Sequence, residues 1–245
     1  MVIGMDVIYL AAGQGKRARL GYPKQFARLG GKPIMVHGLE VLQSMEEIGR
    51  IIITSPVSVP LLPRDRKGVG HAIVGYGITK AICVTGGRTR QESVRQALQY
   101  AQSEYVLITE AVRPFITAEF VRKVIETPGD FVSPVMPATS SVIEWAIGES
   151  GSIRAIPRER VGEVQMPQKY RTDLLKWVHE RALAFGIVDA TDDASMMIQV
   201  TKRVSDFSDI KPKIIVGLEG NLKITTPLDL IIAEAIYNAR YSDRE

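Results

Sequence analysis

Short apolar runs rich in β-branched residues recur along the chain, and helix-like segments or glycine-rich turns separate them. The runs lack the polar alternation of a half-exposed strand, which predicts strands buried on both faces of a parallel sheet. We expect such strands at residues 7–10, 51–54, 81–84, 105–109, 131–135 and 214–216. Strands that alternate with helices predict an α/β fold, here a single Rossmann-like domain over residues 1–245 with a doubly wound, mostly parallel sheet.

Threonine and proline mark the predicted helix starts. Thr117, Thr172, Thr191 and Thr226 stand where a side-chain oxygen would cap the first turn, and Pro33 and Pro227 suit the first helical position. The expected helices cover about residues 34–45, 117–126 and 172–185, with further helices beginning near residues 90, 191 and 226. Residues 56–77 have weak periodicity, and we expect one poorly formed helix there.

A different pattern begins at residue 137. Residues 137–165 alternate between apolar and polar positions, with turn signals at Gly148 and Gly151. This pattern predicts an extended hairpin with strands at 141–147 and 152–157. A hairpin that projects from an α/β core cannot bury both of its faces by itself. The sequence therefore predicts that residues 137–165 form an arm that contacts a second subunit.

The composition is that of an ordinary globular protein, with 45% hydrophobic and 24% charged residues. No apolar stretch approaches the roughly 20 residues of a membrane span, and the N-terminus lacks the pattern of a secretion signal. The one cysteine, Cys83, excludes an internal disulfide and is compatible with the cytosol. We therefore expect a cytoplasmic protein that does not bind a membrane.

The charged residues narrow the choice of partner. A net charge of +4 permits nucleic-acid binding. However, the basic residues concentrate in a glycine-rich loop without aromatic stacking partners, so we expect no nucleic acid. The three histidines, His37, His71 and His179, are scattered and lack metal-ligand spacing.

The glycine-rich loop follows the first predicted strand, and residues 7–39 contain no acidic residue. Small residues there leave the backbone N–H groups free to approach a ligand closely, which makes an anion site. The small residues are Ala11, Ala12, Gly13 and Gly15, and the basic ones are Lys16, Arg17, Arg19, Lys24, Arg28 and Lys32. The pattern predicts a loop that binds a polyanion.

Two known phosphate motifs fit this loop poorly. The spacing Gly13-x-Gly15-x-x-Ala18 resembles a dinucleotide fingerprint, but Gly21 and Pro23 interrupt the helix that should follow, and the expected acid is missing. The P-loop pattern fails because Ser or Thr does not follow Lys16. A plain solvated basic loop is the remaining alternative.

Three later segments contain residues that could bind a ligand near the ends of predicted strands. Gly86 and Gly87 follow the strand at 81–84, which is where open α/β sheets hold ligands. Glu110 and Arg113 follow the strand at 105–109 and face the same mouth, where they could bind a metal, a ribose or a phosphate. Lys223 lies in an otherwise apolar alternating segment, and an anion would explain its presence there.

The first loop carries a resemblance to a known family. Leu10-Ala-Ala-Gly-Gln-Gly-Lys-Arg17, followed by Pro23-Lys-Gln25, resembles the signature of sugar and polyol nucleotidyltransferases. It is most similar to the cytidylyltransferases that activate 2-C-methyl-D-erythritol 4-phosphate and to their relatives that activate ribitol 5-phosphate. The resemblance extends from Leu10 to the last helix. It implies transfer of CMP from CTP to a polyol phosphate with release of pyrophosphate, and a homodimer formed through the arm at 137–165.

The resemblance also implies roles for individual residues. The catalytic residues would be Arg17 on the outer phosphates, with Lys24 and Lys223 on the phosphate under attack. The nucleotide would be bound by Ala11, Ala12, Gly13, Gly15, Gly86, Ser93, Glu110 and Ala111. The acceptor would be bound by Glu110, Arg113, Arg158 and Thr191. The phosphates of CTP would carry most of the coordination of Mg²⁺ or another divalent cation.

The sequence departs from the family pattern at three positions. Thr109 and Glu110 stand where the family has His-Asp, and Met166 stands where the methylerythritol enzymes have Thr. These changes keep ribitol 5-phosphate, or another polyol phosphate, open as the acceptor. Two other functions also stay open, a Rossmann NAD(P) oxidoreductase and a CTP-binding protein without catalysis.

Overall fold

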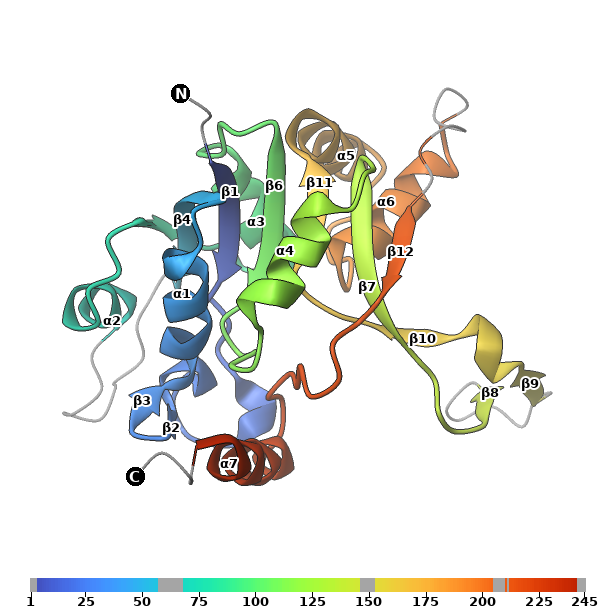
Figure 1. Ribbon diagram of the computed structural model, residues 1–245. Coiled ribbons are helices and arrows are strands. Elements are labelled where there is room, and N and C mark those ends of the chain that lie inside the picture. The colour runs from blue at the N-terminus through green and yellow to red at the C-terminus, as the bar shows by residue number, and fades with distance from the viewer. Residues whose placement is uncertain (1–3, 57–67, 146–152, 205–209, 211, 242–245) are drawn as a thin grey trace.

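The computed structural model describes residues 4–56, 68–145, 153–204, 210 and 212–241 (Figure 1). Its centre is an eight-stranded sheet in the order β10-β7-β11-β6-β1-β4-β5, with β12 paired to β7. The strands are β1 (Met5–Leu10), β4 (Ile48–Ser55), β5 (Ala81–Thr85), β6 (Tyr105–Glu110), β7 (Phe131–Pro137), β10 (Gly162–Val164), β11 (Gln168–Arg171) and β12 (Lys213–Val216). β1, β4, β5 and β6 run parallel to one another, and β12 runs parallel to β7. β10 pairs antiparallel with β7, and β11 pairs antiparallel with both β6 and β7. The prediction of a mostly parallel α/β sheet is confirmed.

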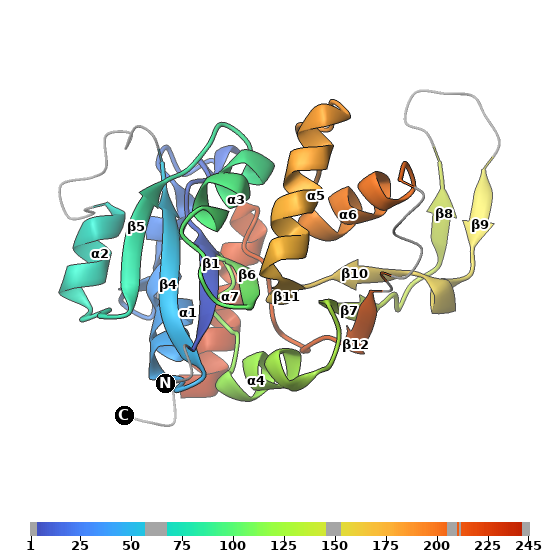
Figure 2. The same ribbon diagram turned by 90° about the horizontal axis from the view of Figure 1, so that it is seen from above.

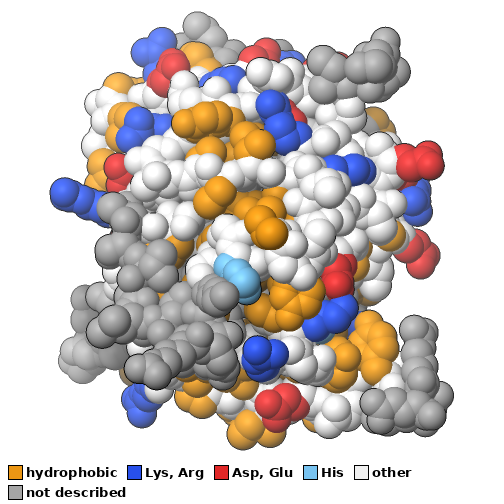
Figure 3. Space-filling view, turned by 90° about the vertical axis from the view of Figure 1, so that its left-hand side faces the viewer, with side chains coloured by type: hydrophobic (Ala, Val, Ile, Leu, Met, Phe, Trp, Pro, Cys, Tyr) orange, Lys and Arg blue, Asp and Glu red, His pale blue; other side chains and the backbone are white. Residues whose placement is uncertain are grey.

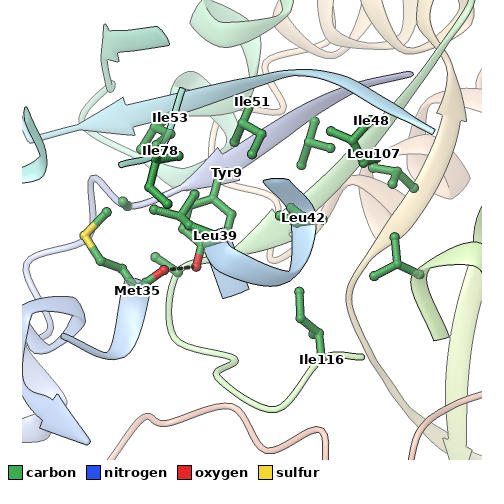
Figure 4. Packing of buried hydrophobic residues seen from close by; sticks show 14 of the residues in the cluster. Tyr9, Met35, Leu39, Leu42, Ile48, Ile51, Ile53, Ile78, Leu107 and Ile116 are labelled. Atoms are coloured by element: carbon green, nitrogen blue, oxygen red, sulfur yellow. Dashed lines mark hydrogen bonds between the residues drawn. The ribbon is translucent and has the colours of Figure 1, made fainter. Parts of the chain in front are cut away.

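Helices cover both faces of this sheet, as a doubly wound fold requires (Figure 2). One hydrophobic cluster joins β1 and β4 to α1 (Ile34–Ser44), α2 (Val69–Gly75) and α4 (Ala118–Glu126). A second cluster packs α3 (Arg90–Leu98), α5 (Thr172–Ala184) and α6 (Asp193–Thr201) on the opposite face. In the first cluster Tyr9 is buried, and its hydroxyl donates to the main-chain oxygen of Met35 at 2.7 Å (Figure 4). In the part of the chain that the structure describes, every helix is too short or too polar to span a bilayer.

Helix α7 (Pro227–Tyr241) lies across one end of the molecule (Figure 1). It packs against the small hairpin of β2 (Arg28–Leu29) and β3 (Lys32–Pro33), and a third cluster contains Leu29, Phe115 and Ile224. Gly30 has a φ of +53°, and a Cβ there would lie 1.9 Å from the ring of Tyr237. The absence of a side chain at Gly30 therefore allows α7 to pack closely against the β2–β3 hairpin.

Two strands differ from the sequence prediction. β11 was not predicted, because its residues Gln-Lys-Tyr-Arg have no apolar run. It is buried nevertheless, since Gln168 donates to Ser133 at 2.9 Å and accepts from Tyr170 at 2.7 Å. β10 lies inside the predicted arm but pairs with β7 in the main sheet. The arm is therefore shorter than residues 137–165.

The remaining part of that segment forms the predicted hairpin. β8 (Val142–Glu144) pairs antiparallel with β9 (Arg154–Ile156), and the hairpin projects from the sheet (Figures 1 and 2). The predicted strands extended to residues 147 and 152, and residues 146–152 lie outside the described chain. The side chains of Ile143, Trp145 and Ile153 are 55%, 55% and 66% exposed. The second subunit that would cover them stays a prediction.

Two of the four predicted helix caps are confirmed. Thr117 accepts from the backbone of Phe120 at 3.2 Å, and Thr226 accepts from that of Asp229 at 3.3 Å just before α7. Both hydroxyls satisfy an otherwise unpaired N–H group of the first turn.

Three predicted positions at helix starts are shifted by one residue, whereas α7 begins at Pro227 and α3 at Arg90 as predicted. α5 begins at Thr172 itself, without a side-chain cap. Asp192 rather than Thr191 caps α6, because the Asp192 carboxylate accepts from the backbone of Ser195 at 2.7 Å. Pro33 likewise precedes α1 instead of being its first residue. An acid one position further on competes well for the cap, because its charge also suits the helix dipole.

Candidate active site

The first loop leaves β1 at the carboxyl edge of the sheet and is shaped by hydrogen bonds to its own backbone. The side-chain amide of Gln25 donates to the oxygens of Ala11 at 2.7 Å and Gly13 at 3.0 Å. Gly15 has a φ of +67°, and a Cβ there would lie 2.9 Å from the backbone nitrogen of Lys24. Glycine is therefore required at this position, and the loop closes around the segment that carries Lys24.

The second loop follows β5 and touches the first. The backbone of Gly86 donates to Ser55 at 2.7 Å, and a Cβ on Gly86 would lie 2.4 Å from the Cβ of Ala12. The hydroxyl of Ser93 accepts from Gly87 at 3.0 Å and donates to the oxygen of Thr89 at 2.9 Å. The structure thus brings Ala12, Gly86 and Ser93 together.

Glu110 ends β6 and joins two basic residues from distant parts of the chain. One carboxylate oxygen lies 2.6 Å from Nζ of Lys223, and the other lies 3.1 Å from Nε of Arg113. The backbone of Ala111 donates to Leu10 at 3.0 Å, which sets this group beside the first loop. Burial alone would raise the pKa of the Glu110 carboxyl, but the positive charges of Lys223 and Arg113 hold it below its usual value.

Lys24 lies near these groups but makes no ion pair with an acid in the described chain. Partial burial and the positive charges of Lys223 and Arg17 lower its pKa from 10.5 to about 8. The charges of Lys223 and Arg17 can lower the pKa of Lys24 only if both lie close to it. The structure therefore brings together the three predicted catalytic residues, Arg17, Lys24 and Lys223, although they come from opposite ends of the chain.

One face of the molecule can be compared with the cations of the site. On the face of the molecule over α1 and α2, basic, acidic and apolar side chains are dispersed among uncharged ones (Figure 3). The site holds a cavity of about 650 Å³, which is lined by the cations Arg113 and Lys223, the acids Glu163 and Asp229, and the amides of Gln165 and Asn221. Its size and its two cations suit a small phosphorylated molecule.

Two predicted acceptor residues lie away from this cavity within one chain. Arg158 is exposed on the short 3-10 helix Arg158–Arg160, in the projecting part of the chain (Figure 1). Thr191 is exposed before α6, and its hydroxyl lies 3.1 Å from that of Ser195. Met166, where the sequence departs from the family, is 4% exposed, so its side chain packs inside the protein.

Sequence reasoning missed a buried charged cluster beside the two loops. Asp193 at the start of α6 lies 2.7 Å from Nη1 of Arg90 and 3.1 Å from Nε2 of His179. Burial would raise the pKa of Asp193, but the charge of Arg90 and the hydrogen bond with His179 lower it to about 2. The three residues come from α3, α6 and α5, so no local pattern in the sequence could reveal the cluster.

The described residues contain no group of three or more His, Cys, Asp or Glu side chains that could hold a metal. Both oxygens of Glu110 already contact cations, and the first loop has no acid. Phosphate oxygens are the ligands that Mg²⁺ commonly uses at nucleotide sites.

The sequence profile of the 2-C-methyl-D-erythritol 4-phosphate cytidylyltransferase family matches residues 5–239. The chain belongs to this family. Proteins of that name from Halalkalibacterium halodurans and Geobacillus kaustophilus are 35% and 33% identical to it. The alignments cover 94% and 97% of this chain and 96% and 99% of the relatives.

Solved structures agree with this membership of the cytidylyltransferase family. The 2-C-methyl-D-erythritol 4-phosphate cytidylyltransferase of Thermus thermophilus superposes with a TM-score of 0.72 and is 26% identical, over 96% of this chain and 99% of that chain. The 4-diphosphocytidyl-2C-methyl-D-erythritol synthase of Anaerococcus prevotii gives a TM-score of 0.76 at 25% identity, over 95% of each chain. The fold and the family expected from the loop motif are both confirmed.

Proposed function

We propose that this protein transfers CMP from CTP to 2-C-methyl-D-erythritol 4-phosphate and releases pyrophosphate. The observation that carries the proposal is the convergence of Arg17, Lys24 and Lys223 beside a loop with few side chains and no acid. A triphosphate is the polyanion that such a loop fits best. Membership of the cytidylyltransferase family supports the base and the acceptor.

The nucleotide would lie across the two loops that touch at Ala12 and Gly86. Backbone N–H groups of the first loop would bind its phosphates, and Glu110 and Ala111 at the end of β6 would contact its ribose. The Ser93 hydroxyl already donates its proton to Thr89, so toward a base it can act only as an acceptor. An acceptor there suits the exocyclic amino group of cytosine, which is a donor.

The acceptor would enter the cavity beside Lys223. Arg113 lines this cavity and contacts Glu110, so a guanidinium that can bind a phosphate stands beside a carboxylate that can bind a hydroxyl. Thr191 does not line this cavity, so it would contact only a part of the acceptor that extends out of the cavity toward the start of α6. The projecting hairpin would reach across a homodimer, so that Arg158 of the partner subunit completes the site.

The homodimer has a simple test, because the hairpin exposes Trp145, Ile143 and Ile153. Large apolar side chains gathered on a projecting element are typical of a protein interface. Sedimentation should give a dimer for the intact chain and a shift to monomer for Trp145→Glu. A monomeric intact chain would contradict the proposed arm.

The reaction needs little proton transfer. A phosphate oxygen of the acceptor attacks the α-phosphorus of CTP in line, the new P–O bond forms, and the bond to pyrophosphate breaks. Because the attacking oxygen is already anionic, catalysis consists of positioning and of neutralising charge. Lys24 and Lys223 would stabilise the negative charge on the reacting phosphate, and Arg17 would stabilise the leaving pyrophosphate. A divalent cation bound to the phosphates would add to this neutralisation.

A pyrophosphate-release assay with purified protein and Mg²⁺ tests this function. CTP, ATP, GTP and UTP would each be combined with 2-C-methyl-D-erythritol 4-phosphate and with ribitol 5-phosphate. Release that is fastest with CTP and methylerythritol phosphate supports the proposal. Release with ribitol phosphate alone would instead support the acceptor suggested by Thr109, Glu110 and Met166. CTP binding without any release would indicate a non-catalytic protein, and NAD(P) binding would indicate an oxidoreductase.

A further inference from the structure

Asn221 is a buried residue that the chemistry proposed above does not use. It is 3% exposed, and its side-chain amide donates to the main-chain oxygen of Met166 at 2.7 Å. Its own main-chain oxygen accepts from Nη1 of Arg113 at 2.9 Å. Lys223 follows two residues later on the same turn. One residue therefore fixes a turn that touches Arg113 and carries Lys223.

The side chains around this turn form a closed ring. Arg113 contacts one oxygen of Glu110 at 3.1 Å, and Lys223 contacts the other oxygen at 2.6 Å. The ring closes because Arg113 also donates to the main-chain oxygen of Asn221, and because Lys223 belongs to the same turn as Asn221. A displacement of the turn would therefore move both cations relative to Glu110.

Residues next to β10 anchor the ring from outside. The side chain of Gln165 accepts from the backbone of Leu218 at 2.9 Å and donates to its oxygen at 3.1 Å. This contact needs a glycine at position 217, because a Cβ there would lie 2.6 Å from Oε1 of Gln165. Together with Met166, Gln165 ties the turn to the segment between β10 and β11, at the base of the hairpin.

The two sides of Lys223 are held differently. On its C-terminal side, the backbone of Ile224 donates to Val112 at 2.9 Å, which is a contact between main chains. On its N-terminal side, side chains tie the turn to the segment between β10 and β11, through the Asn221 amide on Met166 and through Gln165 on Leu218. Removing the Asn221 amide would take away the tie that is nearer to Lys223, and the buried oxygen of Met166 would lose its donor.

We propose that Asn221 is a positioning residue, which sets Lys223 and Arg113 against Glu110 by tying their turn to the base of the hairpin. The proposal rests on the proposed function for the roles of Lys223 and Arg113. It predicts a defect in the chemical step and not in recognition of the base, because Gly86 lies in the loop after β5 and Ser93 lies in α3, both apart from this turn.

Steady-state kinetics of Asn221→Ala test the proposal. We expect kcat to fall roughly tenfold or more, with the KM for CTP within about twofold of the original value. The matched control is Ser103→Ala. Ser103 is also buried and makes two main-chain hydrogen bonds, with Asp6 at 2.8 Å and Tyr105 at 2.6 Å, but it lies at the amino ends of the strands. The control should lose stability without losing kcat.

A second readout does not depend on turnover. Lys223 lowers the pKa of Lys24 by charge repulsion, so a displaced Lys223 should let that pKa rise from about 8 toward its ordinary value. The 13Cε shift of Lys24, followed by NMR against pH, reports this change, and Lys24→Arg assigns the signal. Ser103→Ala should leave the titration unchanged. Gln165→Met, which removes the outer anchor, should shift both readouts in the same direction and serves if Asn221→Ala does not fold.

The outcomes separate the two proposals. If Asn221→Ala or Gln165→Met keeps the kcat and the Lys24 titration of the Ser103→Ala control, Asn221 has only a structural role and the inference is wrong. If the original protein releases no pyrophosphate with any acceptor but the Lys24 titration shifts as described, the proposed function fails and the positioning of Lys223 stands.

Discussion

Two groups of charged side chains lie at neighbouring places on the carboxyl edge of the sheet, and they are balanced in opposite ways. In one, the buried Asp193 is matched by Arg90 at 2.7 Å and by His179 at 3.1 Å. In the other, Lys24 has no acidic partner in the described chain, and the positive charges of Lys223 and Arg17 act on it. In the first group the acid has a counter-charge within the protein, whereas the second group has an excess of positive charge.

The difference separates charges that hold the fold from charges that await a ligand. Desolvation offsets much of what a buried ion pair gains, but removing one partner leaves a charge without solvent or counter-ion, which is strongly destabilising. Cations that outnumber the acids beside them repel one another, and a bound polyanion relieves that repulsion. Substitutions in the first group should therefore affect stability, and those in the second should affect catalysis.

The largest expected effect is on stability, from Asp193→Asn. This change leaves the guanidinium of Arg90 buried without a counter-charge, so the free energy of unfolding should fall by about 3–5 kcal/mol. Denaturation by urea measures it. The neighbouring Asp192→Asn is the matched control, because Asn caps a helix about as well as Asp and the change should stay within about 0.5 kcal/mol. Equal losses for the two variants would mean that the Asp193 cluster is not what stabilises this region.

Next in size is the loss of catalysis in Lys24→Met. Removing a cation from the reacting phosphate should lower kcat by about 10²-fold or more while thermal unfolding stays nearly unchanged. Lys32→Met is the control within the same acid-poor stretch. Lys32 is paired with Glu40 at 2.7 Å on the surface, so its loss should cost at most about 1 kcal/mol of stability and leave kcat intact. Near-normal turnover by Lys24→Met would contradict the contrast between the two groups.

The smallest effect is a dependence of CTP binding on pH. The pKa of Lys24 is about 8 in the folded protein and 10.5 ordinarily, so the unfolded chain binds more protons between these values and stability rises with pH there. Bound triphosphate favours the charged amine, so CTP affinity should fall as pH rises from 8 to 10. Calorimetry at pH 8 in buffers of different ionisation enthalpy should show uptake of about half a proton. Lys24→Arg should bind CTP without this uptake, and an unchanged uptake in that variant would assign the proton elsewhere.

Much of the fold could be predicted because it depends on local pattern. The apolar runs predicted β1, β4, β5, β6, β7 and β12 to within a few residues, and Thr117 marked its helix correctly. The spacing of Glu110 and Arg113 after a strand end predicted that both side chains lie at the same strand-end opening, and in the structure they form an ion pair with each other. β11 was missed because its burial depends on partners for Gln168 and Tyr170 in the folded sheet and not on apolar residues.

The sequence by itself determined six strands of the main sheet, the side-chain-poor loop with its cations, and the family to which the chain belongs. Only the tertiary structure decided which charges meet. Folding brings Lys223 onto Glu110, sets its charge near Lys24, and closes Arg90 and His179 onto Asp193. The physical reason is one of range. Strand and turn preferences act between neighbours along the chain, whereas the Coulomb interactions that tune these groups depend on distance in space and on burial, and folding sets both.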